Sequence, residues 1–463
     1  MMIVSKQQKI FFDFLRFCIG STKEIPSSLK EADWKKLYAI AQKQCLVGVL
    51  FDGIKRLPAE HVGMKKGLLL QWMAESQMLE NTNVRLNDAA ILVSEWFRKK
   101  GFRTCILKGQ GNALMYPNPY SRTPGDIDIW VEGGDKRVIS FVRSISPHKK
   151  ACYHHIEFPS YKGVEVEVHY RPSFLLCFWH NRKLQKYYER VKEEQFSHRV
   201  MLGEQGEIAI PTTEFNLIFQ LTHIFSHLMN EGIGLRQLVD YYFVICDFYK
   251  VYQNSSNHLS SFSNPSVSLS KGSSTFSPSP SSSGSGDVTA PPRCSEPLRS
   301  KDGGPSKVSP DYAGWDRLDA IGDTTSATVS HSTIVCAGST AIGSVASSAS
   351  SSAAIDRVQE ELKELGLWKF AGAIMYIMQE VFGMPASRLI VPPNEKYGRF
   401  VLNEVLEAGN FGKYDARNRF GRSQLGHNLQ RVYRDIRLVK YFLAEAMSEP
   451  LFRVWHFFWR LKH

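Results

Sequence analysis

The sequence lacks the features that define membrane-spanning, secreted and disulfide-stapled proteins. Its 463 residues include 8 cysteines, none in a Cys-x-x-Cys pair, so we expect neither a disulfide framework nor a zinc site built on them. No run of about 18 uncharged apolar residues occurs, so we expect no segment that spans a bilayer. Asp13 and Arg16 interrupt the apolar N-terminal run before a signal-peptide core can form. Together these absences predict a cytoplasmic protein.

The composition is that of a folded, basic protein. Hydrophobic residues make up 43% of the chain and aromatic residues 12%, which supports a packed core and excludes a wholly disordered or collagen-like chain. The length predicts two or three domains of about 150 residues each. A formal charge of +12 favours an anionic partner, whether a nucleotide, a nucleic acid or a phosphorylated substrate.

One segment, residues 254–354, differs from the rest of the chain. It is rich in serine, with Gly, Pro, Thr and Ala, and it contains few large apolar residues. Such a segment cannot bury enough apolar surface to offset the entropy of ordering it, so we expect it to be disordered. Because helical patterns continue on both sides, we interpret it as an insertion whose two flanks pack together.

The remaining chain divides by the period of its apolar residues. Helical spacing predicts an N-terminal helical region over residues 1–98 and a C-terminal helical region over 212–253 and 355–463. Between them, residues 99–211 contain alternating patterns typical of strands, which predict an α+β unit. The predicted strands are 102–107, 126–131 and 163–169, with a short helical stretch at 112–116 after the first.

Carboxylates are paired on two of these predicted strands. Asp126 and Asp128 are two residues apart, so both side chains point to one face of their strand. Glu165, Glu167 and His169 share one face of the later strand in the same way. Close carboxylates repel unless a cation lies between them, and their oxygens suit Mg²⁺ or Mn²⁺. If the strands are neighbours, a third carboxylate completes a two-metal site.

A glycine-containing loop precedes this acidic pair. Lys108, Gly109, Gln110 and Gly111 follow the first predicted strand, where a helix begins. Backbone N–H groups at a helix N-terminus bind phosphate, and glycine allows close approach. Lys108 and Arg122 would supply positive charge to a triphosphate.

The segments ILKGQGNALMYPNPYSRTPGDIDIWV and VEVEVHYRP resemble the nucleotidyltransferases of the DNA polymerase beta-like superfamily, above all their little-characterised bacterial branch. The resemblance continues through HIFSHLMNEGIGLRQLVDYY and the later EAGNFG. It implies an α+β core, a short mixed sheet with helices, flanked by the two helical regions. It also implies that Asp126 and Asp128 bind metal and that Gly109 lies under the phosphates of ATP or another nucleoside triphosphate.

The resemblance also implies a distant third carboxylate. Glu167, two residues before His169, fits the pattern of the branch, and Glu165 on the same face is the alternative. The sequence departs from the superfamily at Gln110, since the phosphate loop usually pairs glycine with glycine or serine. Loss of a serine hydroxyl would remove a phosphate hydrogen bond worth about 1–2 kcal/mol.

Three further features lie in the predicted C-terminal helices. His223 and His227 are four residues apart without an adjoining glutamate, so we expect packing or orientation of a substrate rather than zinc binding. Arg236 and Asp240 could pair with each other or face the cleft, and their spacing within one helix favours the ion pair. Residues 413–463 are basic and aromatic, which is typical of a nucleic-acid surface. We favour an amphipathic helix that buries its aromatic side chains.

The sequence therefore predicts a nucleotidyltransferase that requires Mg²⁺ or Mn²⁺. An acceptor hydroxyl would attack the α-phosphate of a nucleoside triphosphate and release pyrophosphate, the acceptor being a small molecule, a protein or an RNA. Asp126, Asp128 and Glu167 are the predicted catalytic and metal-binding residues, with Glu167 as the base. Alternatives are an inactive nucleotide-binding or partner-binding module, suggested by Gln110, and an RNA-directed enzyme, suggested by the basic C-terminus.

Overall fold

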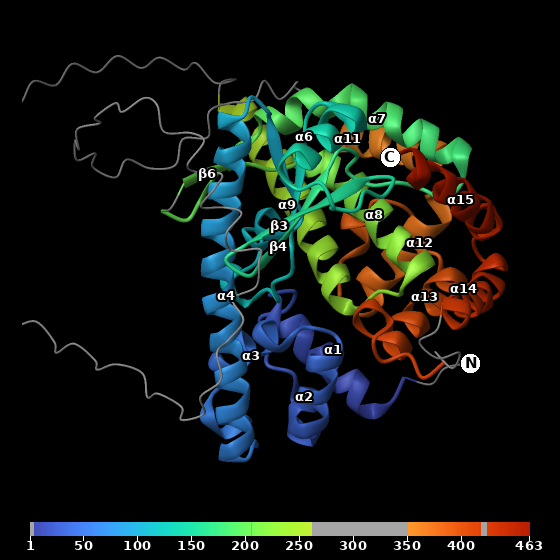
Figure 1. The fold of residues 1–463 in the computed structure, drawn as a ribbon. Helices are drawn as coiled ribbons and strands as arrows, with labels where there is room; N and C mark the ends of the chain where they lie inside the picture. The colour runs from blue at the N-terminus through green and yellow to red at the C-terminus, as the bar shows by residue number, and fades with distance from the viewer. Residues whose placement is uncertain (1–3, 205, 262–350, 418–423) are drawn as a thin grey trace, which may run out of the picture.

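Four helices precede the first strand and form the N-terminal part of the fold. The computed structural model describes residues 4–204, 206–261, 351–417 and 424–463 (Figure 1). Trp72 donates from its indole nitrogen to the carbonyl oxygen of Val47 at 2.9 Å, which ties the long α4 to α3. Further along, α4 contacts β1, β2 and β6 of the next unit. The helices are α1 (Lys6–Cys18), α2 (Trp34–Lys43), α3 (Val47–Lys55) and α4 (Lys66–Lys99), with 3₁₀ turns η1 (Ser27–Glu31) and η2 (Ala59–His61).

A four-stranded mixed sheet follows, in the order β1-β2-β4-β3. The central pair, β2 and β4, is parallel, and the outer pairs are antiparallel. This confirms the expected mixed α+β fold with a short sheet; β1, β2 and β4 match the three predicted strands, and β3 was not predicted. The strands are β1 (Thr104–Leu107), β2 (Ile127–Val131), β3 (His155–Tyr161) and β4 (Val164–His169), with a separate hairpin of β5 (Arg199–Leu202) and β6 (Gly206–Ala209). Between and after these strands lie α5 (Gly109–Ala113), η3 (Pro119–Ser121), α6 (Gly134–Ile145) and α7 (Phe178–Ser197).

The two faces of β2 serve different purposes. Ile127, Ile129 and Val131 belong to an apolar core that also contains side chains of α4 and α6. Trp130 alternates to the other face, where its ring centroid lies 4.7 Å from that of Phe196 on α7. Because side chains along a strand alternate between faces, Asp128 is on the side of Trp130, facing the C-terminal helices.

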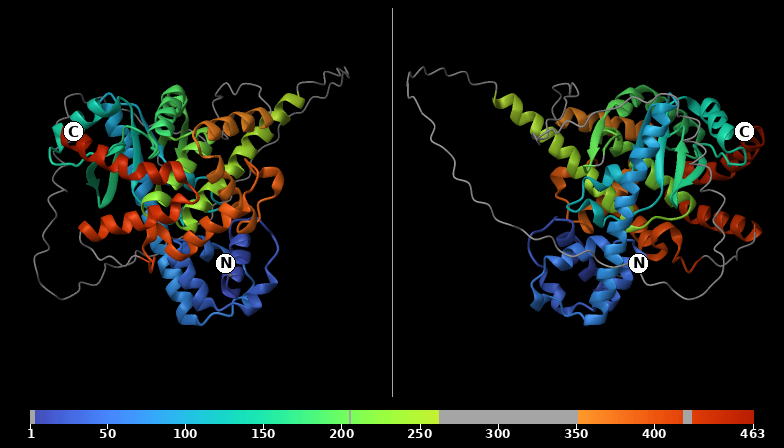
Figure 2. Two further views of the ribbon diagram at one scale, coloured as in Figure 1. Left: turned by 90° about the vertical axis from the view of Figure 1, so that its right-hand side faces the viewer. Right: turned by 60° about the vertical axis from the view of Figure 1, so that its left-hand side comes forward.

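The C-terminal helices cover that side of the sheet (Figures 1 and 2). The flanks of the predicted insertion pack together as expected, since Arg357 pairs with Glu214 at 3.1 Å. Within the predicted insertion, 254–354, residues 262–350 lie outside the described residues. The helix before this range ends at Ser261 and the helix after it begins at Ser351, so both extend into the ends of the predicted insertion. The helices are α8 (Thr213–Asn230), α9 (Leu235–Ser261), α11 (Ser351–Glu364), α12 (Trp368–Glu380), α13 (Glu395–Ala408), α14 (Gln424–Val439) and α15 (Leu443–Lys462), with turns η4 (Ala386–Arg388) and η5 (Asn410–Gly412). None of the helices that the structure describes combines the length and the apolar character needed to cross a bilayer.

Candidate active site

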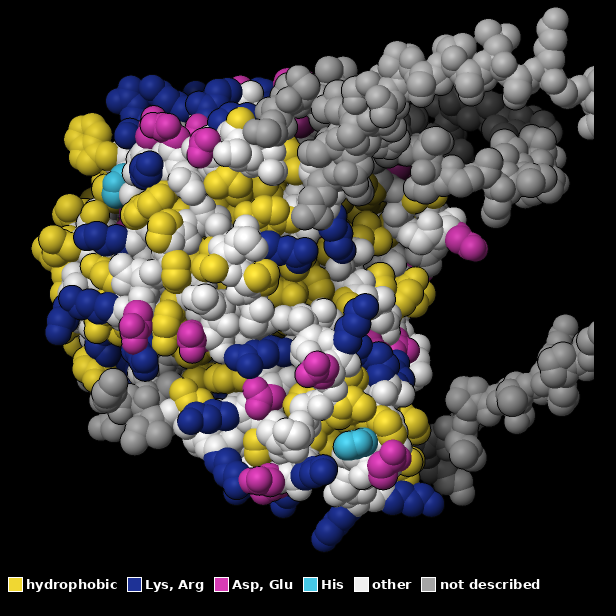
Figure 3. Space-filling model, turned by 180° about the vertical axis from the view of Figure 1, so that it is seen from behind, with side chains coloured by type: hydrophobic (Ala, Val, Ile, Leu, Met, Phe, Trp, Pro, Cys, Tyr) yellow, Lys and Arg dark blue, Asp and Glu magenta, His cyan; other side chains and the backbone are white. Residues whose placement is uncertain are grey.

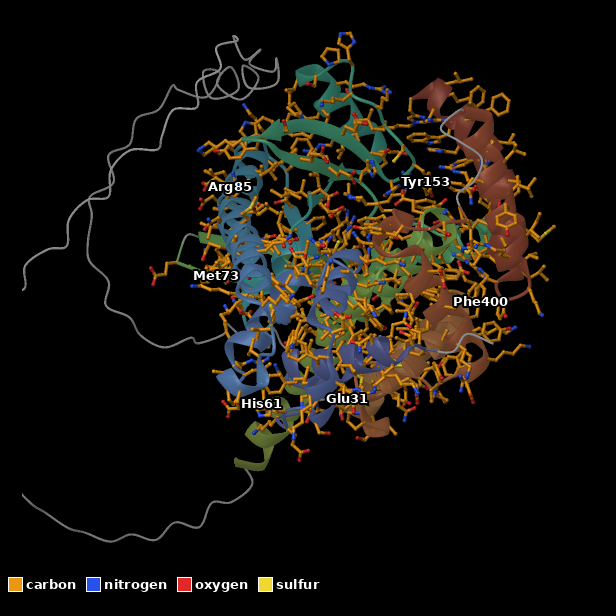
Figure 4. The ribbon with its side chains drawn as sticks, turned by 90° about the horizontal axis from the view of Figure 1, so that it is seen from below. Glu31, His61, Met73, Arg85, Tyr153 and Phe400 are labelled. Atoms are coloured by element: carbon orange, nitrogen blue, oxygen red, sulfur yellow. The ribbon has the colours of Figure 1, made fainter. Side chains whose placement is uncertain are left out.

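A cleft of about 930 Å³ lies between the sheet and the C-terminal helices. Its wall includes acidic side chains from the sheet, a cluster of histidines, and basic side chains from several helices. Arg85 on α4 and Tyr153, just before β3, are among the lining residues and are labelled in Figure 4. The cleft also receives His223 from α8, Arg236 from α9, and Arg431 and Phe452 from α14 and α15.

Three carboxylates converge in this cleft. Asp128 of β2 is paired in register with Glu167 of the parallel strand β4, and Asp126 immediately precedes β2. Carboxylate oxygens of all three lie within 4.8 Å of one another, close enough to hold a metal ion. The expectation that the two acidic strands are neighbours is confirmed. Glu165 also lines the cleft, but it is exposed and is not part of this group.

Mutual repulsion and two protein cations set the charge of this group. The Asp128 carboxylate, followed by burial, raises the pKa of Asp126 above its usual value. Burial would also raise the pKa of Asp128. Lys108 Nζ, 2.9 Å from Oδ2, and His169 Nε2, 2.9 Å from Oδ1, outweigh burial and hold that pKa below its usual range. Asp128 is therefore ionised and paired with both cations.

Two histidines flank Glu167. His155 Nδ1 and His169 Nε2 lie 3.3 and 3.5 Å from Glu167 Oε2, and these three residues form a second group that could hold a metal ion. Burial lowers the pKa of His155 to about 4, so its imidazole is neutral at pH 7. Burial opposes protonation of His169 too, but its hydrogen bonds to Asp128 and Glu167 raise its pKa to about 9. His155 is not among the site residues predicted from the sequence.

The predicted phosphate loop reaches the cleft through its first two residues. Lys108 has φ of 54° and ψ of −136°, a backbone conformation that residues other than glycine rarely adopt. Gly109 has φ of 44°. The ammonium group of Lys108 bridges Asp128 and His223, lying 3.0 Å from His223 Nε2. The backbone strain at Lys108 is thus placed where the lysine contacts an acidic side chain of the cleft.

The second half of the loop is not in the cleft, contrary to expectation. Gln110 is 2% exposed, and its amide hydrogen-bonds to Asn87 of α4. Gly111 is buried, and a Cβ at this position would lie 3.0 Å from Ile210 Cγ2. Since α5 begins at Gly109, its first turn directs residues 110 and 111 into the core beside α4. Both residues hold the loop in place.

Arg122 and Asp240 form a buried ion pair, which corrects two expectations. Arg122 Nε and Nη2 each donate to Asp240 at 2.8 Å, and both residues are at most 5% exposed. Arg122 was expected to bind a triphosphate, but its charge is neutralised by this carboxylate. The predicted ion pair of Arg236 with Asp240 is wrong, because Arg122 occupies both carboxylate oxygens. Within the described residues Arg236 forms no ion pair, and its guanidinium packs beside Gly125.

The two histidines of α8 also lie in the cleft. His223 and His227 approach each other at 2.9 Å between their Nε2 atoms, and His227 Nδ1 is 3.3 Å from Glu231. Burial, followed by the charge of Lys108, lowers the pKa of His223, so this imidazole is neutral. A chain of polar contacts thus runs from His227 through His223 and Lys108 to Asp128.

The comparison with family models agrees with this geometry. Residues 30–252 match a family described as uncharacterised nucleotidyltransferase. In this region the chain is similar to nucleotidyltransferases. The matched range contains the three carboxylates, Lys108 and both histidines of α8, and it supports a general role in nucleotidyl transfer. No curated protein and no solved structure matches the chain.

Proposed function

We propose that this chain transfers a nucleoside monophosphate from a nucleoside triphosphate to an acceptor hydroxyl, with a divalent metal ion and release of pyrophosphate. The observation that carries the proposal is the convergence of Asp126, Asp128 and Glu167 beside Lys108 and Gly109 in one cleft. The core that holds them would correspond to the polymerase beta-like core implied by the sequence resemblance.

The residues present fit a hard divalent cation. Asp126, Asp128 and Glu167 offer only carboxylate oxygens, which are the ligands that Mg²⁺ and Mn²⁺ prefer. The raised pKa of Asp126 is caused first by repulsion from Asp128, and a cation held between the two would relieve this repulsion. When bound, such an ion would stabilise the negative charge that develops on the transferred phosphoryl group.

Basic groups of the chain would bind the triphosphate. Lys108 neutralises Asp128 in the structure, so a cation bound by the carboxylates would leave its ammonium group available for phosphate oxygens. Gly109 would allow close approach of the phosphates to the backbone. Arg236 is a better candidate than Arg122 for the second cation that binds the triphosphate. It lines the cleft beside Gly125 and forms no ion pair among the described residues.

In the proposed reaction the acceptor oxygen forms a bond to the α-phosphorus. The bond from that phosphorus to the oxygen bridging to the β-phosphate breaks, and pyrophosphate leaves with the electron pair. The acceptor's proton passes to the Glu167 carboxylate. His169 Nε2 orients Asp128 by a hydrogen bond and pairs with Glu167 at 3.5 Å. His223, His227 and the cleft residues of α14 and α15 would contact the acceptor.

The test is incubation of the full chain with α-³²P-labelled nucleoside triphosphates, Mg²⁺ or Mn²⁺ and a cell extract. We expect label on one class of acceptor together with released pyrophosphate. Asp128→Asn should lower the rate about 100-fold or more, because the ligand it replaces stabilises transition-state charge. Glu165→Gln is the matched control, a carboxylate of the same cleft outside the convergent group, and should retain activity. Equal rates for Asp128→Asn and the wild type would overturn the proposal.

The inactive-module alternative loses its motivation. It was based on Gln110 replacing a phosphate-binding residue, but the Gln110 side chain is buried against Asn87 and faces away from the cleft. The identity of residue 110 therefore has no direct bearing on phosphate binding, and the transferase remains the function that this site supports best.

A further inference from the structure

The two C-terminal helices present an apolar outer surface. Hydrophobic side chains gather with Lys and Arg along the edge of the molecule formed by α14 and α15, on the left of Figure 3. We call the exposed apolar side chains of these helices the C-terminal apolar face. They are Leu429, Val432, Tyr433 and Ile436 of α14 and Leu443, Met447, Leu451, Val454, Trp455, Phe457, Phe458 and Leu461 of α15.

This face is a regular stripe along α15. Its residues at 443, 447, 451, 454, 458 and 461 recur every three or four positions, so they lie on one side of the helix. Their exposure ranges from 57% to 69%. The opposite side of α15 faces the protein, where Phe452 is 6% exposed and His456 lines the cleft.

The exposed aromatic side chains of α15 differ from the arrangement predicted from the sequence. An amphipathic helix of a globular protein buries its aromatic side chains, yet Phe457 and Phe458 are 52% and 57% exposed. A contiguous apolar surface of this extent normally marks an interaction site. The helical prediction is confirmed. The prediction of buried aromatics holds for Phe452 but not for Phe457 and Phe458.

The charges beside the face all have one sign. The acidic residues of the two helices are Asp435, Glu445 and Glu449, and each is at most 9% exposed. Glu445 accepts hydrogen bonds from the backbone of residues 176 and 177, and Glu449 pairs with Arg453. The charged side chains that are exposed between residues 428 and 462 are all basic: Arg431, which lines the cleft, and Lys440, Arg460 and Lys462.

We propose that the C-terminal apolar face binds the surface of an anionic lipid bilayer, with α15 lying in the plane of the interface. Helices that bind in this way combine leucine and aromatic side chains with lysine and arginine. The aliphatic side chains would enter the acyl boundary, and the exposed Lys440, Arg460 and Lys462 would contact anionic headgroups. The proposal is independent of the proposed function, because the face is on the outer side of helices whose inner side lines the cleft.

Two other occupants suit the face less well. A second copy related by a two-fold axis would bring the same basic residues against each other, without an exposed carboxylate on either helix to compensate. A nucleic acid would match the charge and stack on Trp455, but it offers nothing to the aliphatic stripe from Leu443 to Leu461.

Co-sedimentation of the full chain with lipid vesicles tests the proposal. We expect binding to vesicles of phosphatidylcholine mixed with phosphatidylglycerol, weaker binding as salt increases, and little binding to phosphatidylcholine alone. The double variant Leu451→Glu/Phe458→Glu should lose at least about tenfold in partitioning, because two apolar anchors become charged. Arg460→Glu should lose about fivefold or more on the anionic vesicles.

A matched control separates this face from general surface effects. Met78→Glu changes a side chain of α4 that is 69% exposed and outside the face, and it should bind vesicles like the wild type. All the substituted side chains are exposed, and circular dichroism will show whether each variant is folded. Absence of binding to either vesicle would overturn the proposal, as would undiminished binding by the double variant. A wild-type dimer that Leu451→Glu dissociates, without vesicle binding, would assign the face to a second copy instead.

Discussion

Asp240→Asn tests the claim that Arg122 is a structural residue. The Asp240 carboxylate accepts two hydrogen bonds from Arg122 at 2.8 Å and one from the Tyr116 hydroxyl at 2.6 Å, all in a buried setting. Replacing it with an amide leaves the guanidinium buried without a counter-charge. Breaking a buried ion pair from one side costs about 3–5 kcal/mol, and we expect about 3 kcal/mol because asparagine retains one acceptor oxygen. Arg236 lies near the same carboxylate, which adds repulsion in the variant.

Urea unfolding at pH 7 measures this loss, and a double-mutant cycle isolates the pair. Arg122→Met should also destabilise the protein, but the double variant should lose less than the sum of the single variants because no unpaired charge remains. Burial would raise the pKa of Asp240, and Arg122 reverses this and lowers it. The stabilisation is therefore present above the unfolded-state pKa of about 4 and lost as pH falls through the lower folded-state pKa. A loss of less than about 1 kcal/mol, or strict additivity, would refute the reasoning.

Three further predictions test other parts of the structure. Burial raises the pKa of Asp435 to about 7, so ionising this carboxyl above that pH destabilises the folded protein. Asp435→Asn should therefore stabilise the protein at pH 8, and the gain should disappear near pH 4. Urea unfolding at both pH values measures the difference. Gly48→Ala would place a Cβ against the carbonyl oxygen of Ser121 and should cost about 1–3 kcal/mol in thermal unfolding, whereas Gly67→Ala, which has open space in α4, should be neutral or slightly stabilising. Gln110→Ser should cost about 1 kcal/mol of stability without tighter nucleotide binding in a titration, since residue 110 faces α4; a gain in affinity would contradict its position.

Local periodicity predicted much of the sheet and the acidic group. Alternation along 126–131 and 163–169 placed Asp126, Asp128 and Glu167 on strand faces, and the pairing of β2 with β4 brought them together. The strand β3 was missed because Pro159 interrupts its pattern, and proline disfavours a strand assignment. With β3 the contribution of His155 was missed as well.

Long-range pairing could not be predicted from spacing. The helical interval between Arg236 and Asp240 favoured a local ion pair, but the actual partner, Arg122, is 118 residues away in sequence and reaches Asp240 because α9 packs on α5. Periodicity also identified α15 as amphipathic without revealing which side faces the protein. In both cases the outcome depends on tertiary packing that no local pattern encodes.

Binding of Mn²⁺, followed by electron paramagnetic resonance in the presence of a non-hydrolysable nucleoside triphosphate, tests the central claim most directly. If Asp126, Asp128 and Glu167 hold the cation, the wild type and Glu165→Gln will immobilise Mn²⁺, and Asp126→Asn and Glu167→Gln will bind it at least about tenfold more weakly. Equal Mn²⁺ affinity in all four proteins would contradict the account.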